Sequence, residues 1–128
     1  MKYAFAVAAL IVATSCASNT KSSVTARNDR TTITLEELTQ TGARDLLTAV
    51  QTLRPHWLSV RGASSIHQPE TVKVYLDGSL LGGPEHLRQL STQSVASIRH
   101  LSGIDASQRY GLDHGQGAIL VFTRPGGS

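Results

Sequence analysis

The chain has 128 residues and a formal net charge of +3, from 12 Lys and Arg against 9 Asp and Glu. This charge is small and scattered, whereas nucleic-acid binding needs a clustered basic face, so we expect no nucleic-acid partner. The length suits a single domain. A single cysteine has nothing to pair with inside the chain, so the fold is expected to form without an intramolecular disulfide.

The N-terminus has the pattern of a secretory signal. Lys2 supplies a positive charge, and residues 3–13 form an apolar run that is too short to span a bilayer. Small residues follow at Ala13 and Ser15, as a signal peptidase requires. We therefore expect residues 1–15 to be a cleaved signal peptide.

The lone cysteine, Cys16, follows Ala13-Thr14-Ser15, and this segment resembles the lipobox of bacterial lipoproteins. The resemblance implies a lipid anchor at Cys16, and ordinary cleavage that leaves an unmodified thiol is the alternative. In that sorting pattern, Ala17 implies the outer membrane. Each buried acyl methylene contributes about 0.8 kcal/mol, so several chains would anchor the protein firmly. Residues 16–30 are small and polar, which is typical of a flexible tether.

Local signals predict the first ordered elements. Thr34 and Glu37 have the spacing of a capping box at a helix start. A clearer helix is predicted over 43–54, with its apolar residues on one face and its end before Pro55. Residues 57–62 are expected to form a short strand.

The second half alternates between strand and helix signals. Period-two alternation predicts a strand over 72–76, and Asp77-Gly78 predicts a tight turn after it. Leu87 and Leu90 are expected to face inward. The other expected elements are a brief return at 79–81, a short helical piece from Pro84, a strand over 95–101, a helical turn over 105–110 and a last strand over 118–123. The fold class is therefore α+β, a small mixed sheet of four strands with two or three helices packed on one side.

In this order, residues 31–124 resemble the plug domain of TonB-dependent outer-membrane receptors, followed by a tail at 125–128. The resemblance rests on an opening helix before an arginine-glycine pair, a strand that ends in Asp-Gly, and a glycine-bearing segment after the strand over 95–101. The positions that match this pattern are Arg61, Gly62, Asp77, Gly78, Gly103, Tyr110, Gly111, Gly115 and Gly117. One departure is that Ile104 stands where the family commonly has proline.

The resemblance implies a non-catalytic interaction module at the periplasmic face of the outer membrane. No barrel strands are present in the chain, so transport by the chain alone is not expected. The implied partners are a β-barrel receptor or a TonB-type protein, and the residues proposed to contact them are Trp57, Arg109, Tyr110, Asp113 and His114. Packing inside the fold is the alternative for the two aromatic residues. The alternative function is a periplasmic protein that binds a small ligand, a metal chelate or a glycan, at the glycine loops.

The sequence gives little support for catalysis. Asp113 and His114 are adjacent, and neighbouring loop side chains diverge, so we expect no metal site there. No serine lies in a Gly-x-Ser-x-Gly elbow, and Gly82-Gly83 lacks the lysine of a phosphate-binding loop. We expect neither an enzyme activity nor a cofactor.

Overall fold

The computed structural model describes residues 29–60 and 71–126. Its centre is a five-stranded mixed sheet with the order β1-β4-β5-β2-β3, in which only the β2–β5 pair is parallel. The strands are β1 (Thr32–Thr34), β2 (Lys73–Leu76), β3 (Ser79–Gly82), β4 (Val95–Leu101) and β5 (Ala118–Thr123). The predicted α+β fold class is confirmed.

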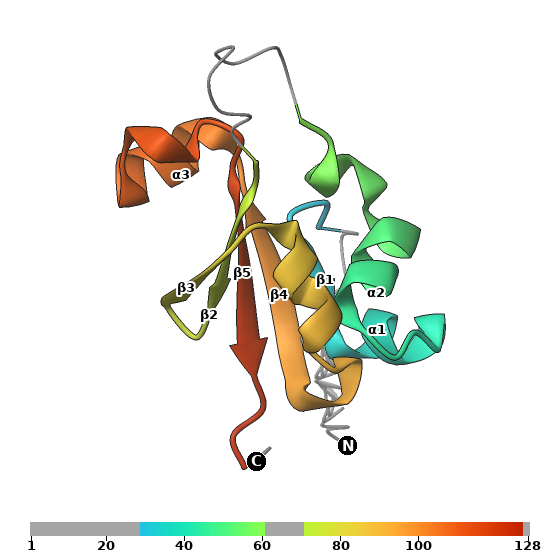
Figure 1. Cartoon of the computed structure of the whole chain (residues 1–128). Coiled ribbons are helices and arrows are strands. Elements are labelled where there is room, and N and C mark those ends of the chain that lie inside the picture. Colours follow the sequence, from blue (N-terminus) through green and yellow to red (C-terminus); the bar gives the residue numbers. More distant parts are fainter. Residues whose placement is uncertain (1–28, 61–70, 127–128) are drawn as a thin grey trace, which may run out of the picture.

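Helices lie on both faces of this sheet (Figure 1). The helices α1 (Leu35–Thr41) and α2 (Leu46–Leu53) cover one face together with the 3₁₀ turn η2 (Pro84–Gln89). Helix α3 (Gly103–Tyr110) packs on the opposite face, near one end of the sheet. Three further 3₁₀ turns are η1 (Pro55–Leu58), η3 (Thr92–Ser94) and η4 (Leu112–His114). Among the helices in the described residues, none is long and apolar enough to cross a bilayer.

The capping box predicted at Thr34 is present. The Thr34 hydroxyl accepts a hydrogen bond from the Glu37 amide at 3.4 Å, and the Glu37 carboxylate accepts one from the Thr34 amide at 3.0 Å. Gly42 ends α1 in the left-handed conformation, with a φ of 64°. A cap of this kind satisfies backbone groups that a helix leaves unpaired, so these local residues fix where α1 begins and ends.

The main core lies between the sheet and α1, α2 and η2. Alternate strand residues point into it, so Val74, Ile98 and Ile119 are fully buried against helical residues such as Leu46. Burial of one such side chain contributes about 1.5–3 kcal/mol. Leu87 is fully buried and Leu90 packs partly buried against the same cluster, as predicted.

A smaller core lies on the other face, under α3. Tyr75, Ala118 and Leu120 of the sheet pack against Ala106 of α3, and Leu101 and Tyr110 lie at its border. The prediction that all helices pack on one side is therefore wrong. Strand alternation is the physical reason, because Tyr75 and Leu120 point away from the face that Val74 and Ile119 use.

Two further predictions fail at the start of the sheet. Residues 57–60, predicted as part of a strand, lie instead in η1 and in the irregular segment after it, because Pro55 opens a 3₁₀ turn and fixes its first φ angle. Residues 61 and 62 of that predicted strand lie outside the described residues. Strand β1 was not predicted, since three residues are too few to show alternation. The second predicted helix begins at Leu46, because Asp45 is its N-cap and accepts from the Thr48 amide at 2.9 Å.

Candidate functional site

The Asp-Gly turn after β2 is structural. Asp77 and Gly78 both have positive φ, 46° and 89°, as the tight turn between β2 and β3 requires. The Asp77 carboxylate accepts hydrogen bonds from the Thr123 amide at 3.0 Å and from the Thr123 hydroxyl at 2.6 Å. These bonds lower the pKa of Asp77, with the hydroxyl bond as the largest cause. The side chain therefore ties this turn to the end of β5.

The glycines of the closing motif meet at the opposite end of the sheet. A Cβ on Gly103 would overlap the backbone carbonyl of Gly115, so these two backbones touch directly. Gly117 has a φ of 99°, and a Cβ there would lie 2.6 Å from the carbonyl oxygen of Leu101. Glycine is needed here for close backbone approach, which brings the start of α3 onto the loop before β5.

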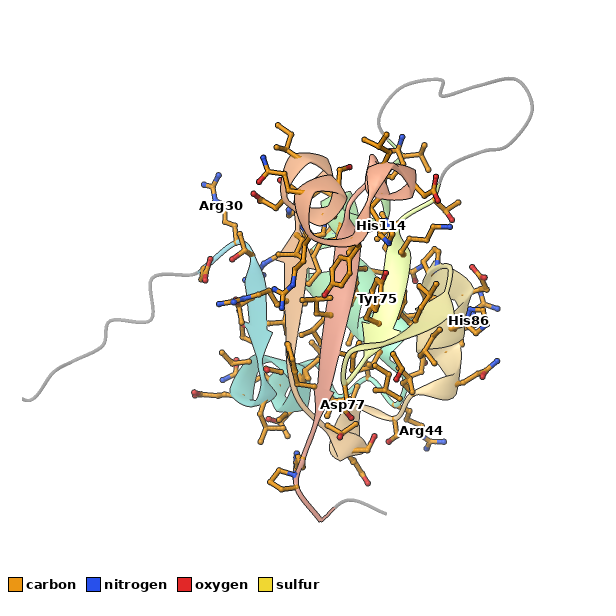
Figure 2. All side chains as sticks on the ribbon, turned by 90° about the vertical axis from the view of Figure 1, so that its left-hand side faces the viewer. Arg30, Arg44, Tyr75, Asp77, His86 and His114 are labelled. Atoms are coloured by element: carbon orange, nitrogen blue, oxygen red, sulfur yellow. The ribbon has the colours of Figure 1, made fainter. Side chains whose placement is uncertain are left out.

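An aromatic cluster lies between β2, α3 and η4. It includes or adjoins three residues that were predicted to contact a partner, namely Arg109, Tyr110 and His114. The rings of Tyr75 and Tyr110 stack with centroids 4.4 Å apart, and the Tyr75 hydroxyl lies 2.7 Å from Nε2 of the buried His114. Figure 2 shows Tyr75 and His114 close together on this face. The Arg109 guanidinium lies 5.5 Å from the Tyr110 ring centroid. Burial, and then the neighbouring Tyr110, raises the pKa of Tyr75.

The hydrogen bonds of His114 indicate which tautomer its neutral ring adopts. Its Nδ1 lies 3.2 Å from the Gly111 carbonyl, which can only accept, so Nδ1 donates. In the neutral ring Nε2 then accepts the Tyr75 hydroxyl proton. Both ring nitrogens are therefore satisfied inside the fold, and this histidine holds η4 against the sheet.

The residues predicted to contact a partner do not form one surface. Trp57 is buried on the α2 side of the sheet, only 1% exposed, and Arg109 and Tyr110 lie on the α3 side. Asp113 is exposed, whereas His114 beside it is buried. Packing inside the fold, the alternative for the two aromatic residues, holds for Trp57 and largely for Tyr110. The predicted positions Cys16, Arg61 and Gly62 lie outside the described residues.

Trp57 fixes the start of β1. Its indole Nε1 donates to the Arg30 carbonyl at 3.1 Å, and its ring stacks on His100 with centroids 5.2 Å apart and planes 14° apart. The His100 amide donates to the Thr31 carbonyl at 2.7 Å. The first described residues, which the sequence assigned to the tether and the adjoining domain start, are thereby attached to the end of β4.

A cavity of about 240 Å³ opens at this end of the sheet, and we call it the β1–α3 cavity. It lies between the start of β1, η1, the end of β4, the start of α3 and the loop before β5. Its lining includes Arg30, His56, Trp57, His100, Ser102 and Gln116, together with the touching backbones of Gly103 and Gly115. Sequence reasoning missed Arg30 and His100 as site residues, because their meeting depends on how β1 pairs with β4.

The α3 side of the sheet is only partly covered. Strand register places Leu80, Tyr75, Leu120 and Arg99 in one row across this face, and it places Phe122 opposite Ser97 in the next row. Leu80 is 56% exposed and Phe122 is 41% exposed. We call the part formed by Leu80, Ser97, Arg99 and Phe122 the open sheet face. Phe122 was missed as a site residue, since the sequence shows it only as one member of an apolar run.

Metal binding finds no support in the described part of the chain. No group of three or more His, Cys, Asp or Glu side chains there is close enough to hold an ion.

Comparison of the chain with protein-family models, with curated proteins and with solved structures gives no match. The two candidate sites are therefore defined by geometry alone: the open sheet face and the β1–α3 cavity.

Proposed function

We propose that the protein is a non-catalytic binding module of the cell envelope that docks on another protein through the open sheet face. The observation that carries the proposal is the exposure of Leu80 and Phe122 on a face that α3 leaves uncovered. Aromatic and arginine side chains are favoured at the centres of protein interfaces, and Phe122 lies with Arg99 on this face. The remaining residue, Ser97, is small and would let a partner approach the strands.

The resemblance of the sequence to plug domains supports a choice of partner. It favours a β-barrel protein of the outer membrane or a TonB-type protein. The apolar run at 3–13 and the lipobox-like segment at Cys16 support a lipid-anchored protein at the periplasmic face of the outer membrane. Docking and anchoring are separate parts of the proposal, and each has its own test.

Photo-crosslinking in cells tests the docking surface. A photoreactive phenylalanine analogue is placed at Leu80 or Phe122 of the full-length protein. The matched controls carry it at Thr48 or Gln51, which are exposed residues of α2 on the opposite side of the molecule. We expect an adduct from the first two positions alone, with a barrel or TonB-type protein identified in it by mass spectrometry. Equal adducts from α2, or no adduct from the open sheet face, would refute the docking surface.

Mass spectrometry of the mature N-terminus tests the anchor. We expect the first residue to be Cys16 with the added mass of acyl chains, and we expect Cys16→Ser to release the protein from the membrane fraction. An unmodified cysteine on a soluble mature protein would refute the anchor and leave the docking proposal to the crosslinking result.

The second candidate function is binding of a small ligand, and one observation favours it. The β1–α3 cavity is lined by arginine, histidine, serine and glutamine residues beside Trp57, and the glycine contacts at the end of the sheet form one of its walls. The cavity and the open sheet face use different residues, so the two functions do not exclude each other.

A further inference from the structure

We infer that the β1–α3 cavity binds a small oxyanion, a solute that carries carboxylate or phosphate groups. This inference rests on the second candidate function and not on docking. The described residues that line the cavity include one permanent cation, Arg30, and two imidazoles, His56 and His100, but no carboxylate. Arginine binds carboxylate and phosphate oxygens through two parallel hydrogen bonds, which favours such an anion over a neutral ligand.

The cavity walls are held by the chain itself. Trp57 stacks on His100 and bonds the Arg30 carbonyl, so the backbone that carries the guanidinium is fixed to the same platform as one imidazole. On the other side, Gly103 and Gly115 have no side chains, and backbone groups therefore form that wall. When the walls of a site are already fixed, the free-energy cost of ordering them on ligand binding is smaller.

The size of the cavity limits the ligand. Pockets for drug-sized molecules measure about 300–1,000 Å³, and this cavity, at about 240 Å³, is smaller. A ligand of the size of phosphate or a small di- or tricarboxylate fits that volume. An oligosaccharide does not.

Two carboxylates lie beside the lining and work against an anion. Asp29 accepts from the Thr31 hydroxyl at 2.7 Å and from the Thr31 amide at 3.1 Å, and Asp105 accepts from the Ser102 hydroxyl at 2.7 Å. Both are therefore occupied by donors of the chain. They still oppose an incoming negative charge, so removal of one of these charges should strengthen binding. The direction of this change in affinity distinguishes an oxyanion from a cation, because removal of a carboxylate charge would weaken the binding of a cation.

Titration of the full-length protein, followed by backbone amide NMR signals, provides the test. The probes are inorganic phosphate and citrate at constant ionic strength, with glucose as a neutral probe. We expect saturable shifts of the Gly103 and Gly115 amides with at least one of the two anions and none with glucose. Arg30→Gln should weaken binding at least about tenfold, because a lost charge-assisted contact of 1.4 kcal/mol corresponds to that factor. Asp105→Asn should strengthen it.

Arg44→Gln is the matched control. Arg44 is also an exposed arginine, and it lies far from Arg30 at the other end of the molecule (Figure 2). We expect its substitution to leave anion binding unchanged. Absence of saturable shifts with both anions would overturn the inference, and so would equal weakening by Arg30→Gln and Arg44→Gln. Glucose binding at the same amides would overturn the oxyanion but support the second candidate function. Thermal melting of each variant verifies that it is folded.

Discussion

Tyr75→Phe isolates the hydrogen bond inside the aromatic cluster. The substitution removes one oxygen atom and keeps the stack on Tyr110, whose ring centroid lies 4.4 Å away. It leaves Nε2 of His114 without the hydroxyl that lies 2.7 Å from it, and His114 is only 7% exposed. A buried acceptor that loses its donor costs about 1–3 kcal/mol. We therefore expect the free energy of unfolding to fall by about 1–3 kcal/mol.

Urea unfolding followed by the fluorescence of Trp57, the single tryptophan, measures this change. In a domain of this size each kcal/mol lowers the melting temperature by about 4–8 °C, so a thermal melt gives an independent value. Tyr110→Phe is the control, because in the described part of the chain the Tyr110 hydroxyl makes no hydrogen bond. Equal stability losses in the two variants would show that the Tyr75 hydroxyl does not hold η4 in place.

The pH dependence of the unfolding free energy, compared between the unaltered protein and Tyr75→Phe, tests whether the Tyr75 hydroxyl is buried. The pKa of Tyr75 is raised in the folded state above its ordinary value of 10.0, so its neutral form is favoured there. The stability that this provides is complete below pH 10 and is lost as the pH rises through the folded pKa. We expect the unfolding free energy of the unaltered protein to fall above pH 10, and to fall less in Tyr75→Phe. The same alkaline slope in both would contradict burial of this hydroxyl.

Three further substitutions test other parts of the structure. Gly103→Ala forces a side chain into the Gly115 backbone, so we expect urea unfolding to show a loss of at least about 1–3 kcal/mol, and a neutral result would exclude the contact. Thr34→Ala removes the α1 cap, and thermal melts should show a loss of about 1 kcal/mol. The depressed pKa of Asp77 provides stability above pH 3.8 that is lost as the pH falls through the folded value. Asp77→Asn should be less stable at pH 7 and should show a weaker acid dependence, measured by unfolding at pH 7 and pH 3.

Much of the fold could be predicted because its signals are local. The capping box at Thr34, the alternation over 72–76 and the Asp77-Gly78 turn each depend on neighbouring residues, and each is found. Strand β1 could not be predicted, because it is a strand only through its pairing with β4. The side of the sheet that α3 covers follows from which residues of β5 point that way, and both faces of β5 are apolar.

The candidate sites were predicted less well, because their residues meet only through contacts between distant parts of the chain. Gly103 and Gly117 could be singled out from the sequence as architectural, since a missing side chain is visible there, and in the structure both allow close backbone approach. Arg30 and His100 are 70 positions apart in the chain. Only the Trp57 anchor and the β1–β4 register bring them to one cavity. Similarly, Phe122 becomes an exposed residue only because α3 covers Leu120 and stops short of it.

The middle position of β5 has a consequence for how the chain assembles during synthesis. Strand β5 is the last of the five described strands to leave the ribosome, yet it joins the β1–β4 pair to the β2–β3 hairpin. Until it emerges, two partial sheets expose unpaired edges that could associate with other nascent chains. We expect truncation before residue 118 to yield chaperone-bound or aggregated fragments, because each half lacks the neighbour that completes its hydrogen bonding.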